Sequence, residues 1–378
     1  MRIAILTSVF IPEYGVARVI ASQVPYLVKA GMAVDLYACE LRGDMVPKGV
    51  KAVRIPTHLK GLRWCLKKGR YDVIIAHTDP FYQFLAEDNC GAVTIGYEHG
   101  YPPVELCLPE ERENRLKMIG DRLGYIYPRL SGVIAISNYA RDYVQWPKAD
   151  VIYNGADHYR EYETSASHSV VDENGPIFIL AVTRFRKEEW QYKGLENLCR
   201  LAKELGKGYR IKVVGGGDEE TCARLKDAGV EAHSSVSSPA EMAKLYNGCD
   251  ALVSFSIYET FNLPLAEAGF AHKPALALNV RVHPEVTPFV FNSYEEIRDY
   301  LRTATRSTLK ADGEKMFQFV DSRFRWEQNG TALVGYIKSK CPAPASRRPA
   351  FGKNLVWSFW GLREFVRQNF YKKWKRRA

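Results

Sequence analysis

Long apolar runs are missing from this 378-residue chain. No stretch approaches the roughly 18 consecutive apolar residues that a membrane-spanning helix needs. The chain opens on Met1–Leu6, whose apolar run is short, lacks a small-residue cleavage site after it, and passes directly into Pro12–Gly15. We therefore interpret Met1–Leu6 as part of a first buried strand, and we expect neither a membrane-spanning helix nor a signal peptide.

Paired cysteines are missing as well. The eight cysteines are scattered singly, without a CxxC pair or a Cys/His cluster of zinc-ligand spacing. A disulfide framework is not expected in a chain of this size without a secretion signal. We expect reduced cysteines in a cytoplasmic protein, and no metal site.

The chain also lacks an excess of basic residues along most of its length. The formal net charge is +10, but Ser346–Ala378 holds ten Lys or Arg residues and one acid, Glu364. That segment carries +9, so the rest of the chain is close to neutral. A near-neutral body argues against an extended nucleic-acid groove, and we expect no nucleic-acid partner. Hydrophobic residues at 46% and charged residues at 25% indicate a soluble globular protein.

Short β-rich runs alternate with helical patterns in both halves of the chain. In the first half, the expected strands are Arg2–Phe10, Ala33–Ala38, Asp72–Ala76, Ala92–Tyr97 and Gly132–Ile136, and a helix is expected at Ala17–Ala30. In the second half, the expected strands are Ile177–Val182, Arg210–Val214 and Ala251–Phe255, and helices are expected at Leu195–Leu205, Glu219–Ala228 and Ala240–Tyr246. This alternation is typical of α/β proteins with a parallel sheet covered by helices on both faces.

Two doubly wound, Rossmann-like domains are the expected architecture, with a cleft between the carboxyl ends of their sheets. We assign residues 1–160 to an N-terminal domain, the polar stretch 161–175 to a linker, and 176–340 to a C-terminal domain. The last helix of that domain, opening at Phe324, is a candidate to pack back on the N-terminal domain. Residues 341–353 are interpreted as a spacer and 354–378 as a basic amphipathic tail.

The tail has the pattern of an amphipathic helix, with apolar residues at positions 355, 359, 362, 366 and 370. Aromatic and cationic side chains suited to an anionic membrane surface gather there, namely Trp357, Phe359, Trp360, Phe370, Lys372, Lys373, Trp374, Lys375, Arg376 and Arg377. A terminal helix packed on the body, a disordered tail and a nucleic-acid-binding tail are the alternatives. We favour docking on the inner face of a cell membrane.

Two glutamates lie eight residues apart within Ser256–Ala268, just after an expected strand. Acids near a helix N-terminus are also favoured by the helix dipole, so the spacing alone decides nothing. The run from Glu259 through Thr, Phe, Asn, Leu and Pro to Glu267 and Ala268 resembles the Glu-x7-Glu motif of glycosyltransferase family 4. Members of that family are retaining enzymes that share the GT-B fold of two facing Rossmann domains.

The resemblance implies a site for a nucleotide-diphosphate sugar, which would be the donor substrate. It implies that Glu267 hydrogen-bonds the ribose hydroxyls and that Glu259 contacts the transferred sugar. The backbone amides of Phe261, Asn262 and Leu263, at a helix start, would meet the diphosphate. That placement suits an anion, because the first amides of a helix are free and its N-terminus is positive.

A second pair of segments matches the family in the expected order. Val182–Phe185 and Lys193–Leu195 resemble the Gly-Arg-Leu…Lys-Gly pair. This implies that Arg184 and Lys193 converge on the diphosphate and neutralise charge as it leaves. Alone, an Arg and a Lys at this spacing would be read as surface charges.

Three glycines and a histidine extend the match less specifically. Gly215 and Gly216 stand in a Gly-rich turn after a strand, where the resemblance implies a close approach of the nucleotide. Gly15, within Phe10–Arg18, stands in the loop after the first strand that would face the phosphates. His99 stands at a strand end where the family has a His that touches the donor sugar, and His77 is a weaker candidate.

The chain departs from the family pattern at four positions. Tyr14 stands where many members have a glycine, and Asn262, His272 and Val282 replace further glycines. Because glycine adopts backbone conformations that other residues avoid, we expect these replacements to remove flexible backbone near the phosphates.

These residues together predict a retaining glycosyltransferase that moves a sugar from a nucleotide-diphosphate donor to a hydroxyl acceptor. The expected catalytic residues are Arg184, Lys193, Glu259 and His99, without a cofactor and without a metal. The expected acceptor is a lipid-linked glycan or a lipid, met at the cytoplasmic face of the cell membrane. The alternatives are an epimerase or phosphorylase on the same fold, and a nonenzymatic membrane- or nucleic-acid-binding protein.

Overall fold

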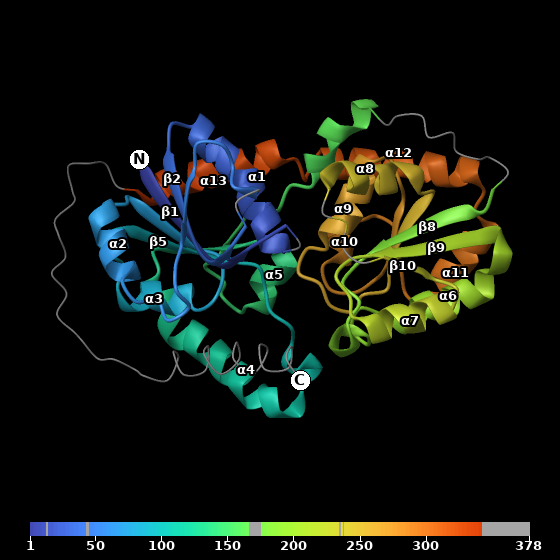
Figure 1. The fold of residues 1–378 in the computed structure, drawn as a ribbon, viewed down its shortest axis with the longest axis horizontal. Helices are drawn as coiled ribbons and strands as arrows, with labels where there is room; N and C mark the ends of the chain where they lie inside the picture. The colour runs from blue at the N-terminus through green and yellow to red at the C-terminus, as the bar shows by residue number, and fades with distance from the viewer. Residues whose placement is uncertain (13, 43–44, 166–174, 234–235, 237, 342–378) are drawn as a thin grey trace.

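The computed structural model describes residues 1–12, 14–42, 45–165, 175–233, 236 and 238–341. Two parallel sheets, each with helices on both faces, form two lobes that lie side by side (Figure 1). This is the predicted α/β architecture of two Rossmann-like domains. Most of the predicted linker and spacer, and the whole of the predicted tail at 354–378, lie outside the described residues.

The first sheet has seven parallel strands in the order β3-β2-β1-β4-β5-β6-β7. Its strands are β1 (Arg2–Phe10), β2 (Ala33–Leu41), β3 (Lys51–Arg54), β4 (Val73–Ala76), β5 (Val93–Glu98), β6 (Gly132–Ala135) and β7 (Asp150–Val151). The order reverses between β1 and β4, which pair in parallel from Ile3 with Val73 to Leu6 with Ala76. β4 is buried at every position, because helices cover both faces of the sheet.

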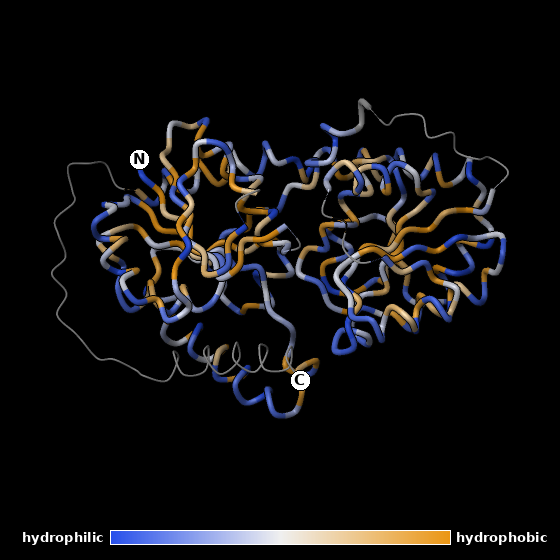
Figure 2. The backbone as a smooth tube through the Cα atoms, in the orientation of Figure 1, coloured by the Kyte–Doolittle hydropathy of each residue, from blue (hydrophilic) through white to orange (hydrophobic). Residues whose placement is uncertain are grey.

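Among the described residues up to Ser165, five α-helices and several shorter turns belong to this lobe. They are α1 (Gly15–Lys29), α2 (Leu62–Gly69), α3 (Phe81–Glu87), α4 (Pro109–Asp121) and α5 (Asn138–Tyr143), with the 3-10 turns η2 (Val104–Leu106), η4 (Tyr127–Arg129) and η5 (Asp157–Ser165) and the π-helical turn η3 (Arg122–Ile126). Figure 2 shows apolar residues concentrated along the strands, whereas α4 is mostly hydrophilic. α4 accordingly has no buried residue.

The second sheet has six parallel strands in the order β10-β9-β8-β11-β12-β13. Its strands are β8 (Ile177–Val182), β9 (Tyr209–Val214), β10 (Glu231–His233), β11 (Ala251–Ser254), β12 (Ala275–Leu278) and β13 (Val290–Phe291). Its helices are α6 (Leu195–Leu205), α7 (Glu219–Asp227), α8 (Pro239–Gly248), α9 (Leu263–Phe270), α10 (His283–Val286), α11 (Tyr294–Thr303) and α12 (Arg306–Asp321), with the 3-10 turns η6 (Lys187–Glu189) and η7 (Gly206–Gly208). Here the order reverses between β8 and β11.

The last described helix, α13 (Trp326–Lys340), returns to the first lobe and packs against α1. Asn329 accepts a hydrogen bond from Gln23 (3.0 Å) and donates one to the carbonyl of Tyr153 (2.7 Å). A Cβ atom on Gly330 would lie 2.3 Å from the Tyr26 side chain, so the close approach of the two helices requires glycine at this point. The two lobes are thus joined both at η5 and through α13.

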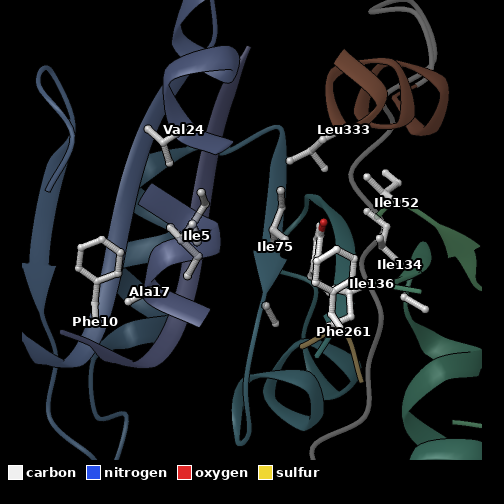
Figure 3. Close-up of a cluster of buried hydrophobic side chains, with 14 of the residues drawn as sticks. Ile5, Phe10, Ala17, Val24, Ile75, Ile134, Ile136, Ile152, Phe261 and Leu333 are labelled. Atoms are coloured by element: carbon white, nitrogen blue, oxygen red, sulfur yellow. The ribbon is translucent and has the colours of Figure 1, made fainter. Parts of the chain in front are cut away.

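One apolar cluster runs through the first sheet and continues into the second lobe. Ile5, Ile75 and Ile134 line its strands, while Leu333 enters from α13 and Phe261 from the loop before α9 (Figure 3). Because Phe261 is 3% exposed and shares this cluster, the loop that carries Glu259 is anchored against the opposite lobe.

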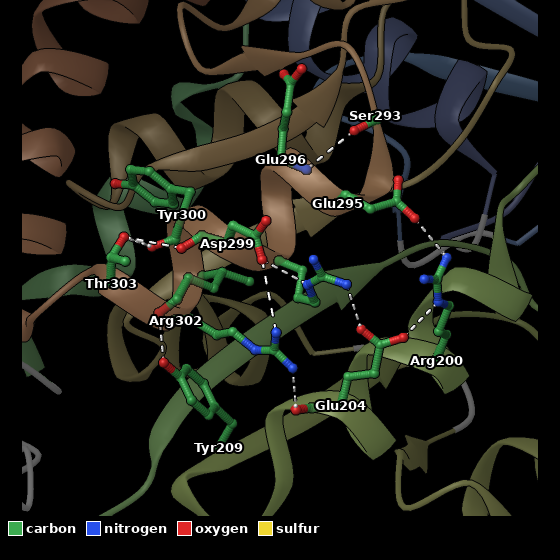
Figure 4. A network of polar contacts seen from close by, with 12 residues as sticks. Arg200, Glu204, Tyr209, Ser293, Glu295, Glu296, Asp299, Tyr300, Arg302 and Thr303 are labelled. Carbon is green, nitrogen blue, oxygen red and sulfur yellow. Dashed lines mark hydrogen bonds and ion pairs between the residues drawn. The ribbon is translucent and has the colours of Figure 1, made fainter.

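Charged side chains tie the outer helices of the second lobe together. Arg200 on α6 donates to Glu204 (2.6 Å) and to Glu295 on α11 (2.9 Å), as Figure 4 shows. Arg200 is 45% exposed, so each such pair adds at most about 1 kcal/mol to stability. This network supports the packing of α6 and α11 and lies apart from the residues of the predicted site.

Candidate active site

Four of the predicted site residues follow the carboxyl ends of strands at or one strand away from the two reversals of strand order. Arg184 follows β8 and Glu259 follows β11, while Gly15 follows β1 and His99 follows β5. In open α/β sheets ligands bind in the crevice outside these strand ends. The topology therefore favours this region as a binding site independently of any motif.

Lys193 and Glu259 form a close ion pair in this region. Lys193 Nζ donates to Glu259 Oε1 at 2.5 Å, and their side chains are 10% and 21% exposed. Burial disfavours the ionised carboxylate, but the Lys193 ammonium and its hydrogen bond outweigh burial and lower the pKa of Glu259. The two predicted catalytic residues are thus brought together, and the Glu259 carboxylate stays ionised.

Arg184 lies nearby but pairs with a different carboxylate, that of Glu189 (2.6 Å). Tyr192 connects the two pairs, because its hydroxyl donates to Glu189 (2.7 Å) and its ring lies 5.4 Å from Lys193 Nζ. Arg184 is 49% exposed, so a ligand in solvent can reach its guanidinium. Glu189 and Tyr192 were not predicted as site residues. The only hint in the sequence is their position between Arg184 and Lys193.

The Gly-rich turn supports the segment that carries Arg184. Gly215 has φ +153°, and a Cβ atom there would lie 2.0 Å from the Thr183 carbonyl. The Phe185 amide donates to the Gly216 carbonyl (3.0 Å), which holds the two loops side by side. Gly216 and Gly15 face open space, with no atom within 4 Å of an added Cβ. Gly215 is required because the backbone of a neighbouring loop leaves no room for a side chain. Gly216 and Gly15 instead border open space.

α9 begins without a side-chain cap, at the helix start where the diphosphate was predicted to bind. Asn262 occupies the N-cap position with φ 60° and ψ 65°, and its side chain makes no capping hydrogen bond. Its amide group instead donates to Ser254 Oγ (3.1 Å) and lies 3.0 Å from His283 Nε2. Because the side chain is turned away, Phe261, Asn262 and Leu263 remain at an uncapped helix N-terminus.

At two of the four replaced glycines, the replacing residue itself adopts a left-handed backbone conformation. Asn262 and His272 both have left-handed backbones, with φ of 60° and 56°. Val282 has φ −82°, and its neighbour Arg281 takes the left-handed conformation with φ 58°. Asn tolerates this region better than most residues because its short polar side chain bonds locally.

Glu267 is 8% exposed and lies one turn further along α9. Tyr246 on α8 donates its hydroxyl to Oε2, and His158 Nε2 lies 3.3 Å from Oε1. Glu267 borders a small pocket of about 10 Å³ formed with Tyr159 and Tyr246. The second predicted glutamate therefore lies beside the crossover segment η5.

His99 belongs to a stack of three rings at the end of β5. His77 Nδ1 lies 3.0 Å from His99 Nε2, and the Tyr97 ring stacks on His77 at 4.9 Å. Burial lowers the pKa of His99 to about 3, and burial together with His99 lowers the pKa of His77 well below its ordinary value. Both imidazoles are therefore neutral at physiological pH and can offer one hydrogen bond without charge.

The two lobes meet directly at the loop of Glu259. Thr260 donates to the carbonyl of His99 (2.7 Å) and accepts, at its own carbonyl, a hydrogen bond from Ser137 (2.7 Å). The hydroxyl of Tyr258 donates to the carbonyl of Tyr101. Glu259 and His99 are consequently held on facing sides of one interface.

A buried charge network lies behind His99 and was not predicted. Arg122, in the π-helical turn η3, donates to both oxygens of Glu98 (2.9 and 2.8 Å) and to Asp79 (2.6 Å). The Tyr82 and Tyr101 rings lie 5.0 and 4.8 Å from its guanidinium. Asp79 is 45% exposed, so this network presents a carboxylate to solvent at the end of β4.

Neither a membrane span nor a metal cluster is found in the described part of the chain. None of the described helices combines the length and apolar character required to cross a bilayer. Within the same residues, no group of three His, Cys, Asp or Glu side chains is placed to hold a metal ion. The ten predicted membrane-binding residues all lie within 354–378, outside the described residues.

Comparison with known proteins agrees with the two-lobed fold. Residues 14–160 match the model of Glycosyltransferase Family 4, and residues 164–288 match that of the glycosyl transferases group 1. No curated protein sequence matches the chain as a relative. The two matched segments fall one in each lobe, in the order that a two-domain glycosyltransferase requires.

Solved structures share the whole two-lobed fold. Sucrose-phosphate synthase from Thermosynechococcus elongatus is 15% identical over 89% of this chain and 98% of its own, with a TM-score of 0.71. HepE of Anabaena, in complex with UDP and glucose, is 16% identical over 90% of this chain and 100% of its own, with a TM-score of 0.70. WaaG, a glycosyltransferase involved in lipopolysaccharide biosynthesis, is 15% identical over 87% and 98%, with a TM-score of 0.61.

The two facing Rossmann-like lobes and the paired matches define a glycosyltransferase of the GT-B fold. Within that class, the chain belongs to glycosyltransferase family 4.

Proposed function

We propose that this protein is a retaining hexosyltransferase that uses a nucleotide-diphosphate sugar and a hydroxyl acceptor. The observation that carries the proposal is the Lys193–Glu259 pair, which faces His99 across the interface between the lobes. A cation and a carboxylate side by side suit a ligand that is anionic at one end and rich in hydroxyls at the other. A sugar attached to a diphosphate is such a ligand.

In the proposed reaction, the bond between the sugar C1 and the β-phosphate oxygen breaks and its electron pair stays on the phosphate. The acceptor hydroxyl oxygen forms the new bond to C1 on the same face, and its proton passes to the departing phosphate oxygen. Lys193 and Arg184 stabilise the negative charge that develops, and the free amides at the start of α9 assist. Glu259 and neutral His99 orient the sugar hydroxyls, and no protein nucleophile is required.

The proposed donor is a nucleoside diphosphate sugar, and UDP-sugars are the first to test because HepE was solved with UDP and glucose. The proposed acceptor is a lipid-linked glycan or a lipid, handled at the inner face of the cell membrane. Two features support that choice: the aromatic and cationic composition of 354–378, and the likeness to WaaG.

A donor screen tests the proposal. UDP- and GDP-sugars are first tested for thermal stabilisation of the full chain, and those that stabilise it are tested for release of the nucleoside diphosphate with and without acceptors. We expect release that increases with a hydroxyl acceptor, and proton NMR of the product should show the anomeric configuration of the donor. Epimerisation without an acceptor, turnover that requires inorganic phosphate, or an inverted product would each contradict the proposal.

A further inference from the structure

His158 lies on the crossover between the two lobes and is almost fully enclosed. Its side chain is 9% exposed, and its ring packs on Tyr159 at a centroid distance of 4.2 Å. It belongs to η5, which contacts both α8 and α9. His158 is therefore placed beside Glu267 by elements from both lobes.

Trp326 fixes which nitrogen of His158 carries the proton. The indole Nε1 of Trp326 lies 3.2 Å from His158 Nδ1. An indole N–H can only donate, so Nδ1 must accept, and the proton of the neutral imidazole is on Nε2. The first residue of α13 thus sets the direction in which the His158 N–H points.

That N–H is buried without a hydrogen-bond partner among the described residues. Glu267 Oε1 lies 3.3 Å from Nε2 but outside hydrogen-bond geometry. An unpaired buried donor costs about 1–3 kcal/mol, so such a group in a folded protein calls for an explanation. Here the donor, His158 Nε2–H, lies next to Glu267 Oε1. No described side chain donates a hydrogen bond to that oxygen, because the Tyr246 hydroxyl binds Oε2 instead.

A hydroxyl group satisfies both atoms at once. It donates its proton to Glu267 Oε1 and accepts from His158 Nε2–H, since a hydroxyl is both donor and acceptor. A phosphate would be repelled by the carboxylate, and an ammonium would leave the imidazole N–H unpaired. His158 also lines a pocket of about 350 Å³ between α1, η5 and α13.

We propose that His158 is a second hydroxyl-binding residue of the donor site, and that it donates from Nε2 to the ribose hydroxyl that Glu267 receives. The inference rests on the proposed function, because it takes the ligand of Glu267 to be the ribose of a nucleotide sugar. Trp326 is a positioning residue in this arrangement. It acts on the ligand only through the tautomer of His158.

Calorimetric titration of UDP and GDP, each with its 2′-deoxy and 3′-deoxy forms, into the full chain tests this proposal. For the nucleotide that the wild type binds, His158→Leu should weaken affinity about tenfold, the loss of one hydrogen bond. The variant should also lose the preference for the ribose form over one of the deoxy forms, because the two changes remove the same contact. His158→Gln, whose amide N–H reaches a similar position, should recover most of the affinity.

Two further variants keep the test decisive if His158→Leu does not fold. Trp326→Phe keeps the aromatic packing and removes the indole N–H, so it should weaken ribose discrimination about threefold with an intact fold. His58→Leu, at an exposed histidine in the first lobe, is the matched control and should bind like the wild type.

The proposal is overturned if the His158 variants and Trp326→Phe keep the full ribose preference, even at lower overall affinity. That result, with a wild type that binds nucleotide and transfers sugar, leaves the proposed function intact. A wild type that binds neither nucleotide and transfers no sugar overturns the proposed function as well.

Discussion

Neutral histidines are the residue-scale feature that separates this site from a conventional acid–base centre. His99 and His77 lie one hydrogen bond apart and stack with Tyr97, and burial keeps both uncharged. A neutral imidazole can orient a sugar hydroxyl without attracting the diphosphate. Charge stabilisation is then left to Lys193 and Arg184.

The pKa of His99 predicts a pH-dependent stability. In the folded protein it is about 3, below the ordinary value of 6.5, so the unfolded chain binds more protons between these values. The stability is fully present above pH 6.5 and is lost as pH falls below it, by up to about 2 kcal/mol at pH 5 from His99 alone. Urea unfolding at pH 7.5 and 5 measures this change.

His99→Gln should reduce the loss of stability between pH 7.5 and 5, because glutamine does not titrate. His58→Gln, at an exposed position, is the control and should leave the loss unchanged. Equal pH dependence in His99→Gln and the wild type would show that His99 is not kept neutral by burial.

Only part of the candidate site could be predicted from the identity of its residues. The motif residues Lys193 and Glu259 were predicted and lie in contact, because both follow strands that meet at the same sheet edge. Glu189 and His158 were not predicted, because their roles depend on contacts with residues outside their own segments. Such partners carry no local pattern, so a single sequence does not reveal them.

Among the elements, α13 has the largest consequence for the arrangement of the lobes. It begins beside η5, where Trp326 bonds His158, and then runs along α1. Gly330 permits the close approach to Tyr26, whereas Gly335 on the same helix has no atom within 4 Å of an added Cβ. Gly335 can therefore serve as the control position for a substitution at Gly330.

Gly330→Ala should destabilise the protein by about 1–3 kcal/mol, because the new Cβ would overlap the Tyr26 side chain. Gly335→Ala should stabilise it by about 0.5–1 kcal/mol, because alanine favours the helix and meets no atom. Thermal and urea unfolding of the two variants measure the difference. If both are stabilised alike, α13 does not pack on α1 as described.

Elements with a strong local pattern were predicted within a residue or two. β1 and α6 have the predicted bounds, because the first is a continuous apolar run and the second an amphipathic helix that ends at Gly206. β3, β7, β10, β12 and β13 were missed. β3, β7, β10 and β13 are short strands at sheet edges with exposed or half-buried positions, so they lack the apolar run that marks a buried strand. β12 is mostly buried but only four residues long, so its apolar run is too short to stand out.

At the scale of the whole molecule, carboxylates and hydroxyls join the two lobes. Glu285 on α10 accepts hydrogen bonds from the backbone amides of Asn138 and Tyr139 (3.0 and 2.7 Å) and from the Tyr153 hydroxyl (2.6 Å). Asn138 and Tyr139 are the first residues of α5 in the first lobe. The Glu285 side chain of the second lobe therefore binds the start of a helix in the first lobe. With Thr260, this contact holds Glu259 and His99 face to face.

The proposed docking of the protein on a membrane is tested by vesicle flotation. The full chain should float with vesicles that contain phosphatidylserine, because each basic residue near an anionic surface gains about 1 kcal/mol. A chain ending at Lys340 should stay in the soluble fraction. Neutral phosphatidylcholine vesicles are the control, and equal flotation of the two chains would contradict the proposed role of residues 354–378.

The central claim is that a departing diphosphate is held by cations of the second lobe, and the turnover of Lys193→Ala tests it most directly. The measurement is the rate of nucleoside diphosphate release from the donor that the wild type uses, at saturating donor. Removal of one charge-stabilising group should lower kcat on the order of 10²–10³-fold. Lys187→Ala removes a lysine that is 74% exposed in the same lobe and should turn over like the wild type. An unchanged kcat in Lys193→Ala would contradict the account.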